Sequence, residues 1–269
     1  MGKILSTIVA FILAINTNTV VYEQKSIDKE RQSRVVLENE IQESVVVDEI
    51  VAIKSPTISY SSSSSGWWTY PSDIKGTTRS GDDLLVLVNK EYQLPSKYTP
   101  SDLVSASLSG IRKGESFLLR NILINDLKEL VTAATADGID LSIRSGYRSY
   151  STQVSTYNYW LSVNGGSISA TDKISARAGH SQHQLGTAVD FSSSEIQDGL
   201  GGVFSSTKAS VWLANNAWKY GFVISYPSGY ESVTGYNYES WHYRYIGKTY
   251  AQEVHTSGII LELYLRSKN

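Results

Sequence analysis

The chain has 269 residues, a formal net charge of −2 and no cysteine. Without cysteine, a disulfide framework, a thiolate metal site and a cysteine nucleophile are all excluded. No run or stripe of Lys and Arg is present, so the charge pattern gives no support for nucleic-acid binding. Any metal site must therefore be built from carboxylates and from the four histidines, which are His180, His183, His242 and His255.

An apolar run near the N-terminus, from Ile4 to Ile15, follows the basic residue Lys3. The run is too short to cross a bilayer comfortably and has the proportions of a signal-peptide core. Charged and polar sequence follows at once, which favours export over a buried N-terminal helix. No Ala-x-Ala cleavage site follows, so cleavage and retention as an anchor both stay open. We expect residues 1–20 to be a signal peptide or membrane anchor, and the only part of the chain that meets a membrane.

A serine tract, Ser61–Ser65, precedes Gly66 and is typical of a flexible linker. The charged sequence before it contains no sustained heptad, so a coiled coil is not supported. We assign residues 21–81 to a polar stalk, and residues 82–269 to the folded domain that this stalk holds away from the cell surface.

Helical and strand patterns alternate irregularly along the domain. Apolar spacing of three and four residues predicts helices, and alternation predicts strands. The predicted helices are 119–136, 151–164, 206–220 and 248–265, and the predicted strands are 140–145, 187–191 and 222–226. Gly138 is placed to end the first helix. Because regular strand–helix–strand repeats are absent, the pattern favours an α+β domain.

Two short segments carry candidate metal ligands. His183 and Asp190 lie on either side of Gly186, where the backbone can turn tightly, and His242 lies in a second aromatic segment. A catalytic zinc ion usually takes three protein ligands and leaves one position for water. Each of the three residues taken alone is more often structural, but together they indicate a zinc site. The ion would polarise a scissile carbonyl and lower the pKa of its water to about 7.

Two further side chains could serve the reaction. Glu239 lies three residues before His242 and could act as general base without binding the metal. Positions i and i+3 of a regular strand face opposite ways, so we expect Glu239 to lie before the strand or at a bulge. Arg148 follows a predicted strand end, where it could bind a carboxylate, stabilise an oxyanion or form only a surface ion pair. His180 is ambiguous, and His255 on a surface helix is expected to be structural.

Three motifs, which occur along the chain in the order found in a known family, give it a resemblance to that family. They are Ser181-Gln-His183-Gln-Leu-Gly186-Thr-Ala-Val-Asp190, Glu239-Ser-Trp-His242-Tyr-Arg244 and Ser145-Gly-Tyr-Arg148-Ser-Tyr-x-x-Gln153. The chain resembles the VanY-type zinc D-alanyl-D-alanine carboxypeptidases of the M15 metallopeptidase family. The resemblance covers about residues 82–269.

The resemblance implies an α+β fold with a small antiparallel sheet flanked by helices, of the D-Ala-D-Ala metallopeptidase and hedgehog-like kind. It implies one zinc ion per domain, held by His183, Asp190 and His242. It also implies Glu239 as general base and Arg148 as the group that stabilises the oxyanion. Ser181 and Gln153 match positions that line the substrate cleft. The implied partner is a peptidoglycan stem peptide, whose terminal D-alanine is removed, and we expect the enzyme to act as a monomer.

The chain departs from the family pattern at two positions. Ala178 stands where proline is common, and Gln182 where glutamate is common. We expect neither residue to touch the predicted ligands. An L,D-carboxypeptidase acting on tetrapeptides is a close alternative, and an endopeptidase cutting within the stem or cross-bridge is another. A non-catalytic wall-binding module is disfavoured, because the predicted ligands and the base are all present.

Overall fold

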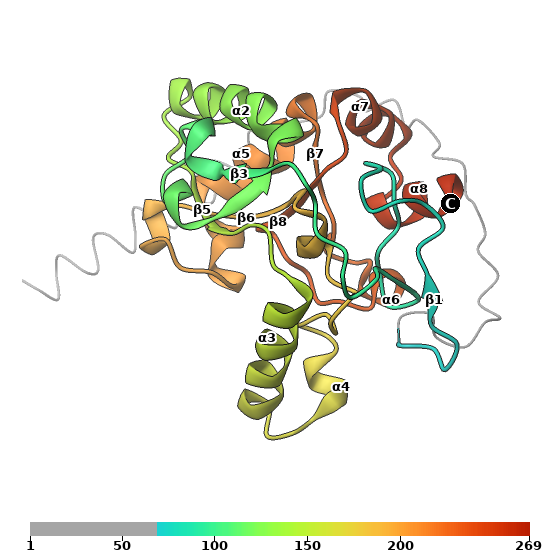
Figure 1. Cartoon of the computed structure of the whole chain (residues 1–269). Helices are drawn as coiled ribbons and strands as arrows, with labels where there is room; N and C mark the ends of the chain where they lie inside the picture. The colour runs from blue at the N-terminus through green and yellow to red at the C-terminus, as the bar shows by residue number, and fades with distance from the viewer. Residues whose placement is uncertain (1–68) are drawn as a thin grey trace, which may run out of the picture. The chain divides into compact units, whose positions relative to one another are not determined.

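A four-stranded antiparallel sheet forms the centre of the computed structural model, which describes residues 69–269 (Figure 1). In sheet order its strands are β5 (Ser142–Ser145), β6 (Ala188–Ser192), β8 (His242–Tyr245) and β7 (Phe222–Ile224). Two smaller sheets pair β1 (Lys75–Gly76) with β2 (Tyr92–Gln93), and β3 (Leu103–Ser105) with β4 (Leu118–Arg120). The predicted mixture of helices and small sheets is confirmed.

The alternation of side chains along β6 and β8 divides the sheet into two chemically different faces. On one face, Val189, Phe191 and Tyr243 belong to the main hydrophobic core. This core is completed by apolar residues of α2 (Ile124–Ala136) and α5 (Lys208–Asn216). The other face carries Asp190 and His242, which are nevertheless buried. The polar ligands thus lie on the face of the sheet opposite the helical layer.

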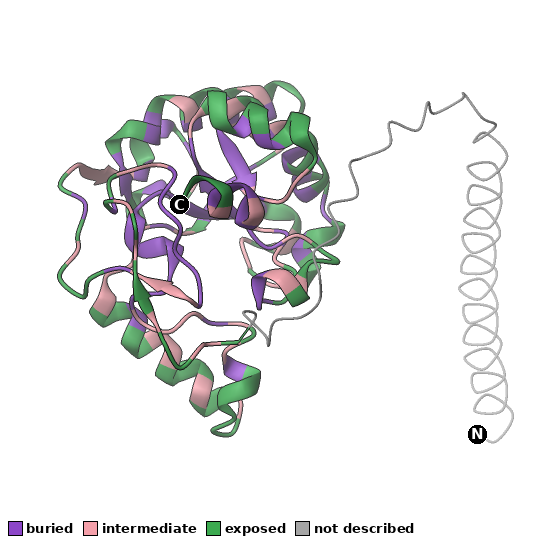
Figure 2. Ribbon diagram, turned by 90° about the vertical axis from the view of Figure 1, so that its right-hand side faces the viewer, coloured by how far each residue is buried: buried purple, intermediate pink, exposed green. Residues whose placement is uncertain are grey.

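The remaining helices lie around this centre. They are α3 (Tyr150–Val163), α4 (Ile168–Thr171), α6 (Glu231–Thr234), α7 (Lys248–Ser257) and α8 (Leu261–Lys268). Helix α3 begins where predicted, because Ser149 caps it by accepting a hydrogen bond from the Thr152 backbone amide at 3.1 Å. Its only buried residue is Gln153, and α3 and α4 project away from the sheet (Figures 1 and 2).

Three of the predicted helices differ from the structure. The segment predicted as one helix from residue 119 starts as strand β4, because Leu119 pairs with Val104 and leaves α2 to begin at Ile124. The predicted helix 206–220 is α5 followed by a 3-10 helix, Ala217–Tyr220. The predicted final helix is two helices, since Gly258 adopts a positive φ of 68° after α7. Apolar periodicity continues across these breaks and does not reveal them.

Residues 69–81 belong to the predicted stalk, but the structure ties them to the domain. Lys75 of β1 pairs with Tyr92 of β2, and the Arg79 guanidinium donates to the Lys268 carbonyl at 2.6 Å. Lys75 and Arg79 therefore contact the folded domain, although both precede its expected start at residue 82. The predicted signal segment and the Ser-rich tract lie outside the described residues. Within residues 69–269, no helix is long and apolar enough to cross a membrane.

Candidate metal centre

Strand pairing and a tight turn bring the three predicted ligands together. Asp190 on β6 lies directly opposite His242 on β8 in the antiparallel register, so their side chains emerge side by side from the same face. His183 comes from a 3-10 helix, Gln182–Leu185, that ends at Gly186 with a φ of 68°. A Cβ atom at Gly186 would also lie only 3.0 Å from the side chains of Arg120 and Leu103. Gly186 therefore returns the chain into β6 as predicted.

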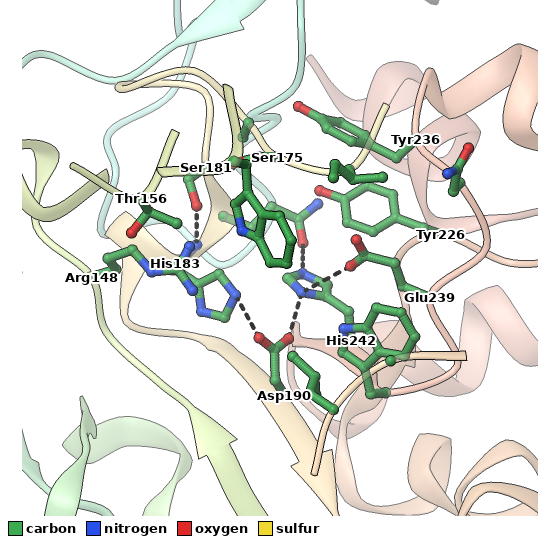
Figure 3. A pocket seen from close by; sticks show the side chains of 18 of the residues that line it. Arg148, Thr156, Ser175, Ser181, His183, Asp190, Tyr226, Tyr236, Glu239 and His242 are labelled. Carbon is green, nitrogen blue, oxygen red and sulfur yellow. Dashed lines mark hydrogen bonds and ion pairs between the residues drawn. The ribbon is translucent and has the colours of Figure 1, made fainter. Parts of the chain in front are cut away.

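The ligand atoms converge on one point (Figure 3). His183 Nε2 lies 3.2 Å from one Asp190 oxygen, and His242 Nδ1 lies 2.9 Å from the other. One ligand atom from each of the three residues lies within 4.8 Å of the others, and all three side chains are buried. Two imidazole nitrogens and a carboxylate form a ligand set that suits zinc.

Each imidazole is held through the nitrogen that faces away from the carboxylate. His183 Nδ1 lies 2.7 Å from the Gly146 carbonyl, and His242 Nε2 lies 3.1 Å from the Gln182 side-chain oxygen. Such outer hydrogen bonds are typical of metal-binding histidines because they fix the ring and its tautomer. The residues therefore fit a zinc ion. The expectation that Gln182 touches none of the ligands is wrong, because its side chain reaches across to the neighbouring strand.

The charges of the centre favour metal binding. Burial acts to raise the pKa of Asp190, but the charges and hydrogen bonds of His183 and His242 outweigh it and hold that pKa well below its usual range. Burial lowers the pKa of His183, which favours the neutral ring. An ionised carboxylate and a neutral imidazole are the forms that bind a metal.

Glu239 lies just before β8, as predicted from its spacing to His242. Its carboxylate is 3.8 Å from His242 Nδ1, and its backbone amide donates to the Tyr226 carbonyl at 3.0 Å. Burial first, and then the charge of Asp190, raise the pKa of Glu239 well above its usual range, while Arg148 acts to lower it. A buried carboxyl with a raised pKa is suited to exchanging a proton near neutral pH.

Arg148 enters the same cavity from the N-terminal side of α3. Its guanidinium donates to the Gln153 side-chain oxygen at 2.8 Å and to the Ser145 hydroxyl at 2.9 Å, and its backbone amide donates to the His183 carbonyl at 3.1 Å. Gln153 in turn donates to the Ala176 carbonyl at 2.6 Å. Arg148 is therefore an oriented group inside the site, and within residues 69–269 it forms no surface ion pair of the kind considered from sequence.

All seven predicted site residues line one cavity of about 490 Å³. Ser181 lies at its wall, where its hydroxyl also accepts from the His183 backbone amide at 3.3 Å. The aromatic lining consists of Trp160, Tyr226, Tyr236, Tyr238 and Trp241, and of these five residues the motifs contain only Trp241. The density of Tyr and Trp around residues 226–245 is the signal in the sequence for four of these five residues.

The other two histidines lie apart from the ligand group. His180 is buried, with Nδ1 2.7 Å from the Asn89 carbonyl. His255 on α7 stacks on Trp218, with ring centroids 4.0 Å apart. Neither belongs to the metal-binding group found among the described residues.

Comparison with known proteins agrees with this geometry. Residues 116–248 match the family model described as VanY, D-alanyl-D-alanine carboxypeptidase. YodJ of Bacillus subtilis (strain 168) is 38% identical over 202 residues, which cover 72% of this chain and 73% of that protein. The chain belongs to the VanY family of D-alanyl-D-alanine carboxypeptidases.

Two solved structures resemble this VanY-family chain closely. The LdcB LD-carboxypeptidase has a TM-score of 0.64 and 35% identity, covering 72% of this chain and 90% of that one. A vancomycin resistance D,D-pentapeptidase VanY in complex with Zn(II) has a TM-score of 0.56 and 29% identity, covering 69% of this chain and 99% of that one. Membership of this family makes the chain a hydrolase of the metallopeptidase class.

Proposed function

We propose that this VanY-family protein is a zinc-dependent D,D-carboxypeptidase that removes the terminal D-alanine from peptidoglycan stem peptides. The observation that carries the proposal is the buried convergence of His183, Asp190 and His242 in one cavity, with Glu239 and Arg148 facing the same space. The solved VanY relative with Zn(II) supports zinc as the ion.

The residues around the ion divide the chemistry between them. Zinc, when bound by His183, Asp190 and His242, supplies electrophilic activation of the scissile carbonyl and of a water molecule. Glu239 takes the proton from the attacking water and delivers it to the departing amine of D-alanine. Arg148, oriented by Gln153 and Ser145, stabilises the negative charge that develops on the carbonyl oxygen. Ser181 lines the cleft that receives the peptide.

A second candidate is an L,D-carboxypeptidase, and the similarity to LdcB favours it. Both reactions release the same leaving group, D-alanine. They differ in the residue that donates the carbonyl, which is a D-alanine in pentapeptide stems and an L-configured diamino acid in tetrapeptide stems. The groups that act on the carbonyl and on the departing amine therefore serve either substrate equally.

Purified muropeptides separate the two candidates. We expect the zinc-loaded protein to shorten pentapeptide stems by one D-alanine, as measured by mass spectrometry, and to leave tetrapeptide stems largely unchanged. The reverse preference would establish the L,D-carboxypeptidase. The Glu239→Gln variant is the matched control, because it keeps the shape of the cavity and loses the base. If neither stem is shortened, the carboxypeptidase proposal fails.

We also propose that the enzyme acts outside the cytoplasmic membrane, where its substrate lies. The predicted export segment around Ile4–Ile15 supports this location, and residues 21–68 would hold the domain at a distance from the membrane. Cell fractionation with an antibody to the folded domain tests this, and detection in the cytoplasm alone would contradict it.

A further inference from the structure

Gln182 precedes the ligand His183 in the sequence and contacts a second ligand, His242. Its side chain is buried, with 4% of the residue exposed. The amide oxygen lies between the Ser225 hydroxyl, at 2.7 Å, and His242 Nε2, at 3.1 Å. It thereby links the helical turn that carries one ligand to the strand that carries another.

The two nitrogens of His242 have different tasks. Nδ1 faces Asp190 and must present a lone pair to bind a metal, so the proton of the neutral ring must lie on Nε2. The Gln182 oxygen is the acceptor placed to receive that proton. With the amide reversed, its NH₂ group would face Nε2 and favour a proton on Nδ1, which would block metal binding.

Ser225 holds the amide in the required orientation. Its hydroxyl donates to the Gln182 oxygen, and its backbone amide donates to the His242 carbonyl at 3.1 Å. Ser225 is therefore fixed to both residues. His183 has a simpler arrangement, because its outer acceptor is the Gly146 backbone carbonyl and no substitution of a side chain removes it.

We propose that Gln182 is a positioning residue that fixes the tautomer and orientation of His242, so that Nδ1 is presented to the zinc ion. The inference rests on the proposed zinc role of His242. It gives a function to one of the two positions where the chain departs from the family pattern. The acceptor at this position is a neutral amide, so it orients the ring without adding a negative charge to a cavity that already contains Asp190 and Glu239.

Zinc affinity, measured by competition with a chelator in the absence of substrate, tests the proposal. Gln182→Met keeps the volume of the side chain but lacks the acceptor, and we expect it to weaken zinc binding by about 10- to 100-fold. Gln182→Glu keeps an acceptor oxygen and should restore zinc binding to within about threefold of wild type. Gln184→Met is the matched control: Gln184 lies on the same 3-10 helix and donates to the Pro95 and Tyr98 carbonyls, not to a ligand.

A spectroscopic measurement separates positioning from a general effect on folding. In the zinc-loaded protein labelled with ¹⁵N-histidine, we expect a protected Nε2–H signal from His242 that is lost in Gln182→Met and weakened in Ser225→Ala. Wild-type zinc affinity in Gln182→Met, or equal losses in Gln182→Met and Gln184→Met, would overturn the proposal. Because these measurements use no muropeptide, their outcome is independent of whether the enzyme prefers D,D or L,D bonds.

Discussion

Two polar clusters, the first buried and the second only partly buried, lie at opposite ends of the segment from Asp172 to His183, and only one of them converges on a common point. The metal cluster contains His183, Asp190 and His242, whose ligand atoms lie within 4.8 Å of one another. The second group, the lysine–tyrosine cluster, contains Lys90, Tyr70, Tyr236 and Arg177. There the Lys90 ammonium lies 4.0 Å from the Tyr236 ring centroid and 4.8 Å from that of Tyr70.

The two clusters differ in how their charged groups are paired. In the lysine–tyrosine cluster, Lys90 donates to the Asp172 carbonyl, and Arg177 forms a 2.7 Å ion pair with the Asp172 carboxylate while lying 4.1 Å from the Tyr70 ring centroid. These contacts pair each cation with groups that favour it. In the metal cluster, lone pairs and a carboxylate point at the same space, which is stable when a cation occupies it. Acceptors that converge on one point indicate a metal-binding site, whereas cations paired with carboxylates, carbonyls and rings indicate a structural role.

His242→Ala should have the largest effect on the metal cluster. The variant loses one of three ligands, so we expect most of the zinc to be absent and activity on stem peptides to fall on the order of 10³-fold or more. Elemental analysis of the purified protein measures the metal, and unfolding monitored by circular dichroism checks the fold. Full zinc content in a folded His242→Ala protein would remove His242 from the ligand set.

Glu239→Gln should separate catalysis from metal binding within the same cluster. The amide preserves the size of the side chain but cannot take a proton, so we expect turnover to fall about 10²- to 10⁴-fold. Zinc content should stay at the wild-type level, because Glu239 lies 3.8 Å from His242 Nδ1 and is not needed as a ligand. If turnover persists with zinc bound, another group is the base.

Tyr70→Ala, in the lysine–tyrosine cluster, should lower the stability of the fold and leave zinc binding nearly unchanged. Removing the ring deprives Lys90 and Arg177 of a shared partner and leaves a cavity, so we expect the free energy of unfolding to fall by about 3 kcal/mol. Zinc affinity should change less than threefold. Tyr70→Phe is the control: it keeps the ring and loses only the hydroxyl that accepts from the Arg177 backbone amide at 2.8 Å, at a cost of about 1 kcal/mol. Zinc loss in Tyr70→Ala would show that the two clusters are not independent.

Sequence reasoning finds the metal cluster and not the lysine–tyrosine cluster, for physical reasons. His183 and Asp190 lie in one turn-and-strand motif, and alternation along that strand already places Asp190 on a defined face. The aromatic residues that follow the serine tract, Tyr70 among them, predict that the linker is held against the domain, but not that Tyr70 meets Arg177, a residue 107 positions away. No local periodicity records such a contact.

Gln182 shows a second limit of sequence reasoning. The sequence predicts that Gln182 touches none of the ligands, and no local pattern relates it to His242, a residue 60 positions away. The Gln182 amide oxygen nevertheless lies 3.1 Å from Nε2 of His242, on strand β8, which pairs with β6. The antiparallel order of β6, β8 and β7 decides this contact, and that order does not follow from the sequence pattern alone.

The pH dependence of stability should report on Lys90 and sharpen the contrast further. Burial lowers the pKa of Lys90 from its usual 10.5 to about 8, while the nearby charge of Asp172 acts to raise it. Between pH 8 and pH 10.5 the unfolded chain then binds more protons at this site than the folded chain, so stability rises with pH in this window. The rise in the free energy of unfolding should reach about 2 kcal/mol between pH 7 and pH 10, and less to the extent that the tyrosine rings favour the ammonium.

Chemical denaturation of wild type and Lys90→Met at each pH isolates this contribution, because other titrating groups largely cancel in the difference. A flat difference across the window would mean that the rings and the Asp172 carbonyl fully compensate the burial of the charge, making Lys90 a stably charged structural group.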